Sequence, residues 1–254
     1  MLRLERKDKS GRRNAGAGLL RAGTLMLALA APAQAQDLTV LRLNTFPNAT
    51  NLALHMGIAN GVFEKRGIRI DLRFTQNSEA QRNGLAKGEF EIAYSAVDNA
   101  VAMVELAKHD VIIVAGGDGS MNEFMIDLAG PYQGGGIFVM REWARANGPL
   151  LERFLAAYVE ATRMALAPAN RAQAISLIAG RLKQDPAVAE RTYDEALTKP
   201  GGLAPDAKFD LEGFKAVLQL RAEIEGQWNG KPPAPERYID LGYYERAQKL
   251  AGVR

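Results

Sequence analysis

Short apolar runs alternate with helical patterns between residues 38 and 140, and this alternation constrains the fold more than any other feature. Ile68–Phe74 alternates apolar and charged residues strictly, as a half-buried strand does. Other short apolar runs predict strands at Leu38–Leu43, Ile92–Tyr94, Val111–Ala115 and Gly136–Met140. Because helical patterns separate most of these runs, we expect an α/β lobe with a parallel sheet and right-handed crossovers.

The expected helices of this lobe have recognisable ends. Leu52–Lys65 has a helical pattern, and Gly67 can terminate it. Ser78 and Gln81 have the spacing of a capping box, which predicts a helix from Ser78 to Lys87. A third helix is expected over Ala96–Lys108. The lobe therefore extends over residues 36–140.

The sequence after residue 141 is almost wholly helical in pattern. Pro149–Ala167 is amphipathic, with an apolar stripe at helical spacing. Asp185, followed by proline, and Asp210 are typical helix N-caps. We expect residues 141–254 to form a helical C-terminal region that packs on the lobe.

The first 35 residues have the pattern of an export signal. A basic stretch ends at Arg21, ten uncharged and mostly apolar residues follow, and Ala33-Gln34-Ala35 has the small-x-small pattern of a cleavage site. This predicts a signal peptide that is removed after Ala35 and a periplasmic protein. An uncleaved amphipathic helix is the alternative, and Arg12-Arg13 leaves the Sec and twin-arginine routes open.

Charge and composition exclude several classes of function. Residues 1–35 carry seven basic and two acidic residues, so the formal net charge of +3 comes from the leader and the remainder is slightly acidic. A nucleic-acid-binding protein needs a basic face on its folded body, and we expect no such partner. The chain has no cysteine, which excludes disulfides, thiolate metal sites and a lipid anchor on cysteine. With only two histidines, we also expect no metal site and no cofactor.

Small polar side chains follow the predicted strands at their carboxyl ends, where open parallel sheets bind ligands. These side chains suit a small polar ligand held by hydrogen bonds, and we identify no pair of a nucleophile and a base among them. We therefore expect a binding protein and not an enzyme. The candidate ligand contacts are Phe46, Asn48, Asn51, Asn77, Ser95 and Asn122.

Several motifs, in order, resemble one known family. A strand, a polar loop, a helix ending in a Gly-x-Phe-x-x-x-Gly-Ile pattern and a second strand are typical of it, and a turn and a returning strand follow. The motifs are Leu43–Pro47, Leu54–Ile68, Gly88–Ala93 and Gly134–Val139, with Trp143 and the long helical stretch 149–168 after them. Together they cover most of residues 38–250. This pattern resembles the periplasmic solute-binding proteins of ABC importers in the aliphatic-sulfonate, nitrate and thiamine-precursor class.

The resemblance implies a type 2 periplasmic-binding fold, in which two α/β lobes enclose the solute and the protein delivers it to a permease in the inner membrane. Most of the second lobe of this family lies between the fourth strand and the returning strand. Here only residues 125–131 separate Phe124 from Tyr132, and a strand–helix–strand unit needs about 30 residues. We therefore expect the second lobe to be largely missing, which leaves open a non-functional or repurposed binding protein.

Asp98 is a second departure from the resemblance and a further candidate ligand contact. Sulfonate- and nitrate-like members offer an uncharged helix N-terminus to the anion, whereas Asp98 places a carboxylate in that first turn. This favours a neutral or partly cationic ligand such as a heterocycle. A simple helix-capping role for Asp98 remains the alternative.

One motif indicates a different class of protein. Gly116-Gly117-Asp118-Gly119-Ser120, followed by Asn122-Glu123, resembles the phosphate loop of lipid and NAD kinases. A glycine-rich turn after a strand can hold phosphates with its backbone amides. A kinase is therefore the enzyme alternative, although the export signal and the helical sequence that follows the motif disfavour it.

Overall fold

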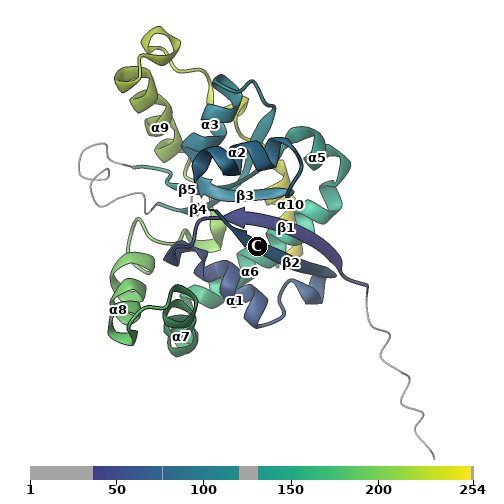
Figure 1. Cartoon of the computed structure of the whole chain (residues 1–254), viewed down its shortest axis with the longest axis vertical. Helices are drawn as coiled ribbons and strands as arrows, with labels where there is room; N and C mark the ends of the chain where they lie inside the picture. Colours follow the sequence, from purple (N-terminus) through teal and green to yellow (C-terminus); the bar gives the residue numbers. More distant parts are fainter. Residues whose placement is uncertain (1–36, 76, 120–130, 253–254) are drawn as a thin grey trace, which may run out of the picture. The chain divides into compact units, whose positions relative to one another are not determined.

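The computed structural model describes residues 37–75, 77–119 and 131–252, and one five-stranded sheet lies at their centre (Figure 1). The chain divides into Met1–Ala35 and a compact unit, Gln36–Arg254. The predicted signal peptide lies outside the described residues. In the sheet the strand order is β2-β1-β3-β5-β4. The strands are β1 (Thr39–Thr45), β2 (Ile68–Phe74), β3 (Ile92–Ala96), β4 (Val111–Asp118) and β5 (Gly135–Met140).

The sheet is mixed, which corrects the expectation of a purely parallel one. β1 pairs in parallel with β2 and β3, whereas β5 runs antiparallel to both of its neighbours, β3 and β4. A parallel return needs a crossover of about a dozen residues or more. Instead, Asp118 at the end of β4 pairs with Gly135 at the start of β5. β5 therefore begins beside the end of β4 and runs back antiparallel to it.

Helices cover both faces of the sheet. Successive side chains of a strand point to opposite faces, and in β4 they pack against two different groups of helices. Ile112 and Val114 of β4 belong to a core cluster with α1 (Leu52–Ala59), α6 (Gly148–Leu166) and α10 (Gly242–Leu250). Val111 and Ile113 belong to a second cluster with α2 (Ser78–Ala86), α3 (Val97–Glu105) and α9 (Leu211–Ile224). Figure 1 shows α2 and α3 on one side of the sheet and α1 and α6 on the other.

The helices after β5 share these cores with the strands. α5 (Arg141–Ala146) follows β5 directly, and α6 packs against α1 and α10. A third cluster joins Leu52 and Met56 of α1 to α7 (Arg171–Leu182), α8 (Pro186–Arg191) and a π-helix at Thr192–Leu197. Short 3₁₀ turns complete the described elements at Ala49–Asn51, Glu64–Arg66, Pro168–Asn170, Pro205–Ala207, Gln227–Gly230 and Pro235–Arg237.

Some predicted helix ends are confirmed and others differ. The helix predicted over Leu52–Lys65 is shorter than expected, because α1 ends at Ala59; Gly67, with φ of 73°, instead ends the 3₁₀ turn Glu64–Arg66 immediately before β2. The Asp185 side chain accepts a hydrogen bond from the Ala187 amide at 2.8 Å, and Asp210 accepts one from Gly213 at 3.0 Å. At α2 the N-cap is Asn77 and not Ser78 as predicted, because Asn77 Oδ1 accepts a hydrogen bond from the Glu79 amide at 2.7 Å.

The described part of the chain contains one sheet and two isolated β-bridges, and no second sheet is found in it. No described helix has both the length and the apolar character that a membrane span requires. Residues from both sides of position 140 contribute to the same core clusters, so the sheet and the later helices form one packed structure.

Candidate functional site

A pocket of about 640 Å³ lies at the carboxyl ends of β1, β3 and β4. We call it the polar pocket, because most of the side chains that line it can form hydrogen bonds. Its lining comes from the loop after β1, from α2 and α3, and from the ends of β3, β4 and β5. The residues are Thr45, Phe46, Asn48, Thr50, Ser78, Arg82, Tyr94, Ser95, Ala96, Asp98, Asn99, Asp118 and Gly135.

The loop after β1 forms one wall and is held by its own side chains. Asn51 is fully buried; its amide nitrogen donates to the Phe46 carbonyl oxygen at 2.5 Å, and its side-chain oxygen accepts from the Thr45 hydroxyl at 2.9 Å. Asn48 is exposed, and its side-chain oxygen accepts from the Thr50 hydroxyl at 2.8 Å. Asn51 therefore shapes the loop, while Phe46 and Asn48 face the pocket.

Helix α2 brings Ser78 and Arg82 to the pocket from successive turns of one helical face. Asn77 does not line the pocket, because its side chain caps α2. Gln81 is fully buried and joins three elements. Its amide nitrogen donates to the Asn44 carbonyl oxygen of β1 at 3.1 Å, and its side-chain oxygen accepts from the Ser95 hydroxyl of β3 at 2.7 Å.

Helix α3 contributes the polar groups of the opposite wall. Asn99 accepts a hydrogen bond from Arg82 Nη1 at 2.7 Å through its side-chain oxygen, which links α3 to α2. Asp98 lies in the first turn of α3, where the helix dipole favours a negative charge. Its side chain is 41% exposed.

Tyr94 and Asp118 lie at the base of the pocket and are buried. The Tyr94 hydroxyl donates to Asp118 Oδ2. Burial raises the pKa of the Tyr94 hydroxyl well above its usual range, and the adjacent Asp118 carboxylate raises it further. Tyr94 therefore remains a neutral hydrogen-bond donor at every physiological pH.

Gly116 and Gly117 of the kinase-like motif lie in a strand and not in a turn, and Gly119 follows the end of that strand. β4 continues through Gly116, Gly117 and Asp118, three residues beyond its predicted end. A Cβ at Gly117 would overlap the Tyr94 ring, and one at Gly116 would overlap the Lys208 backbone. These glycines permit close packing, so the phosphate-loop interpretation is wrong for the described residues Gly116–Gly119; Ser120 and Asn122 lie outside the described residues.

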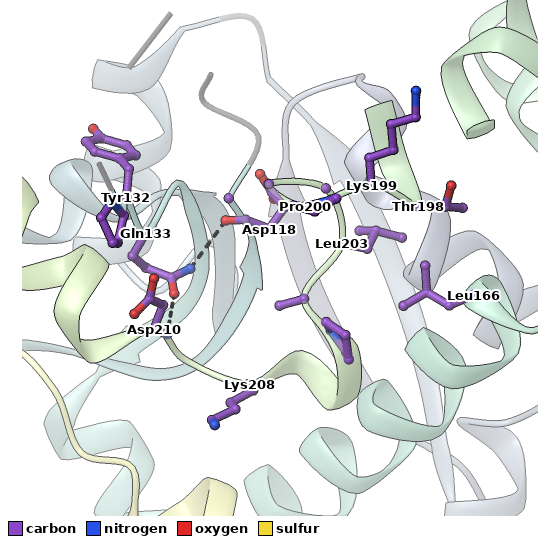
Figure 2. Close-up of a pocket in the computed structure, with 16 residues that line it drawn as sticks. Asp118, Tyr132, Gln133, Leu166, Thr198, Lys199, Pro200, Leu203, Lys208 and Asp210 are labelled. Carbon is purple, nitrogen blue, oxygen red and sulfur yellow. Dashed lines mark hydrogen bonds between the residues drawn. The ribbon is translucent and has the colours of Figure 1, made fainter. Parts of the chain in front are cut away.

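A larger cavity of about 780 Å³ is also lined by Asp118 (Figure 2). The Gln133 amide nitrogen donates to the Asp118 carbonyl oxygen at 3.3 Å, and its oxygen accepts from the Asp210 amide at 2.7 Å. Proline, glycine and apolar residues of 198–205 form much of the remaining wall, with Lys199 and Lys208 at exposed positions. A smaller share of its lining residues is polar than in the polar pocket, and we do not assign the site to it.

The structure brings together four of the seven residues predicted as ligand contacts: Phe46, Asn48, Ser95 and Asp98 line the polar pocket. Asn51 and Asn77 do not line it: the Asn51 side chain is bonded to Thr45 and Phe46, and the Asn77 side chain caps α2. Asn122 lies outside the described residues.

The sequence patterns do not indicate Arg82, Tyr94 or Gly135 as parts of the site, and they indicate Asp118 only within the kinase-like motif. The i, i+4 spacing of Ser78 and Arg82 is a signal that could have identified Arg82. Tyr94 and Gly135 carry no such signal, because their places depend on how β3, β5 and β4 pair. The glycine-rich motif predicts a loop at Asp118, whereas the pairing of β4 with β5 places Asp118 at the end of a strand.

The described residues include no cluster of side chains of the kind that holds a metal ion. Neither His55 nor His109 lines the polar pocket. Within 37–75, 77–119 and 131–252, no three histidine, aspartate or glutamate residues are close enough together to hold a metal ion. The pocket instead offers an arginine, carboxylates, amides and hydroxyls, which is a donor and acceptor set suited to reversible binding of a small polar molecule.

No protein-family model and no curated protein sequence matches the chain. Several solved structures are similar in fold. The ligand-binding component of an ABC-type import system from Staphylococcus aureus, determined with zinc bound, is 12% identical with a TM-score of 0.64; the match covers 82% of this chain and 99% of that one. The periplasmic nitrate-binding protein NrtA from Synechocystis is 8% identical with a TM-score of 0.65, covering 86% and 90%.

The periplasmic aliphatic sulphonate binding protein SsuA from Escherichia coli is 14% identical with a TM-score of 0.56, and the match covers 79% of this chain and 92% of that one. At these identities the likeness concerns the fold. The chain has the periplasmic-binding-protein fold, which confirms the fold expected from the sequence resemblance.

Proposed function

We propose that this chain is the substrate-binding component of an ABC importer and that the polar pocket binds its solute. The observation that carries the proposal is the position of the pocket: polar side chains from four separate segments meet at the carboxyl ends of β1, β3 and β4. In open α/β sheets ligands bind at this edge. The fold shared with binding components of ABC-type import systems supports the same role.

The proposal extends to location and partner. The signal-like leader supports export to the periplasm, with cleavage after Ala35 and transient delivery of the solute to a permease in the inner membrane. The protein itself performs no chemistry on the solute. The sulfonate, nitrate and thiamine-precursor class suggested by the sequence sets the first panel of compounds, together with neutral heterocycles.

A ligand screen tests the binding role. The purified protein is heated with each compound of the panel, and a compound that raises the melting temperature is then measured by calorimetry. Ser95→Ala removes a pocket hydroxyl, and we expect it to weaken binding by about 2- to 12-fold, the equivalent of one hydrogen bond. Ser176→Ala, on the exposed face of α7, is the matched control.

Two results contradict the binding proposal. One is a full panel in which no compound stabilises the protein; the other is a ligand whose affinity is the same in the Ser95 and Ser176 variants. Export is tested separately by N-terminal sequencing of the periplasmic fraction, where we expect Gln36 as the first residue. Full-length protein found only in the cytoplasm contradicts the export proposal.

A further inference from the structure

Two opposite charges face the polar pocket from different helices. Arg82 enters from α2 and Asp98 from α3. The ion pairs of the described residues do not include one between them, and Arg82 has no carboxylate within 4.0 Å among those residues. Its hydrogen bond to the neutral Asn99 amide orients the guanidinium without neutralising it. Arg82 therefore offers a charge and free donors to a ligand.

Asp98 is also incompletely paired. Its Oδ1 is buried and accepts no hydrogen bond within the described structure. Its Oδ2 lies 3.8 Å from Arg221 Nη1, at the outer limit of an ion pair, and Arg221 is also shared with Glu225 Oε2 at 3.0 Å and with the Gln227 side chain at 3.3 Å. The Asp98 carboxylate is thus only partly compensated by Arg221, and because its side chain is 41% exposed it offers a negative charge to a ligand in the pocket.

The wall near these two charges has an apolar part. Phe46 is half-buried at the pocket, and Ala96 lies at the end of β3 between Ser95 and the start of α3. These groups suit a short hydrocarbon segment. The pocket thus presents a cation, an apolar surface and an anion, which is complementary to a molecule with a negative group, a short carbon chain and a positive group.

We propose that the solute is a small zwitterion, with its anionic group bound by Arg82 and its cationic nitrogen donating to Asp98. This inference rests on the proposed function and names the chemical class of its solute. A simple anion pairs with Arg82 but meets the Asp98 carboxylate without compensation, whereas a neutral heterocycle leaves the Arg82 charge unpaired. Only a molecule with both charges satisfies both side chains.

Calorimetry on the purified full chain with two matched pairs of probes tests this inference. Ethanesulfonate is compared with 2-aminoethanesulfonate, and propanoate with 3-aminopropanoate. The two members of each pair differ by one ammonium group, and the two pairs differ in their anionic group. We expect the aminated member of at least one pair to bind about tenfold or more tightly than its partner. The pair that binds more tightly, sulfonate or carboxylate, identifies the anionic group that the pocket prefers.

Substitutions assign the effect to the two side chains. Asp98→Asn keeps the shape of the side chain and should abolish the preference for the ammonium group, while Arg82→Gln should weaken every probe that binds. Glu79→Gln and Lys87→Gln change exposed charges at the two ends of α2 outside the pocket, and both should leave the preference unchanged. Melting temperatures of the unliganded variants verify folding.

The outcomes separate the inference from the function on which it rests. Equal affinity within both pairs, a preference that survives Asp98→Asn, or no binding of any probe at millimolar concentration overturns the zwitterion inference. In each case a compound from the panel that binds the protein and is weakened by Ser95→Ala leaves the proposed function standing. Absence of any such compound overturns both.

Discussion

The loop after β1 and the N-terminal halves of α2 and α3 bring similar polar side chains to the same edge of the sheet, but the protein uses them differently. In the loop, both ends of the Asn51 amide bind the loop itself. On the helices, Arg82 and Asp98 face the pocket without a strong charged partner in the described structure. A polar residue beside a strand end is therefore a good ligand candidate only where the local backbone does not already use it.

The sharpest test of this comparison is a pair of substitutions within one loop. Asn51→Ala leaves the buried Thr45 hydroxyl and the Phe46 carbonyl without their partners, and we expect it to lower the free energy of unfolding by about 2–5 kcal/mol. Asn48→Ala changes an exposed residue of the same type and should lower stability by less than about 1 kcal/mol. Urea denaturation measures both. Equal losses would show that Asn51 does not support the loop.

Acid should destabilise the segment that follows this loop. Burial, with a smaller contribution from the Arg181 charge, lowers the pKa of His55 on α1 to about 4 from an ordinary value of 6.5. Between these values the unfolded chain binds a proton that the folded chain does not. Stability is thus fully retained above about pH 6.5 and falls by about 3 kcal/mol as the pH drops to about 4.

Urea denaturation across this pH range, in the parent protein and in His55→Leu, isolates this contribution. Leucine cannot titrate, so we expect the variant to lose about 3 kcal/mol less than the parent between pH 6.5 and 4. His109→Leu is the control, because His109 is neither a core residue nor a pocket residue. Parallel curves for the parent and the His55 variant would contradict the assignment.

At the base of the polar pocket, in contrast to its walls, we expect one substitution to change both the stability of the protein and its affinity for ligand. Gly117→Ala places a Cβ against the Tyr94 ring, and overpacking of this kind costs about 1–3 kcal/mol. Because Tyr94 lines the pocket, ligand affinity should fall in the same variant. Gly180→Ala is the control: no neighbouring group lies within 4 Å of its Cβ position, and alanine should stabilise α7 by about 0.5–1 kcal/mol. A Gly117 variant as stable as the parent would show that Tyr94 can move away.

Local patterns in the sequence predicted local structure well. The strict alternation at Ile68–Phe74 gave β2 with its observed bounds, and the aspartates before α8 and α9 were identified as caps from residue type and position. These features depend on neighbours within a few residues. The resemblance of several short motifs in order then predicted the fold, which no single motif could do.

Features set by long-range pairing were not predicted. The placement of β5 between β3 and β4 decides that Gly117 is a strand residue against Tyr94, and this contact joins parts of the chain that are far apart in sequence. Arg82 was missed for a related reason, since its role depends on α3 supplying Asn99 across the pocket. Which residues form the site thus depends more on the order in which the strands pair than on any sequence motif.

The smallest expected effect concerns two adjacent residues at the start of α2, one used by the backbone and one facing the pocket. The Asn77 side chain accepts hydrogen bonds from the Glu79 and Ala80 amides at 2.7 and 3.3 Å, whereas Ser78 lines the polar pocket. Asn77→Ala should therefore lower the free energy of unfolding by about 1 kcal/mol, as loss of an N-cap does, with little change in ligand affinity. Ser78→Ala should instead weaken ligand binding and leave the free energy of unfolding almost unchanged.

Urea denaturation and calorimetry on these two variants therefore form a crossed experiment. If Ser78→Ala lowers stability and Asn77→Ala does not, the capping box expected from Ser78 and Gln81 operates in solution, and the pocket has one polar contact fewer. If both variants lose stability and neither loses affinity, this end of α2 is structural throughout. Arg82, one turn further along, would then be the only residue of α2 that we assign to the pocket.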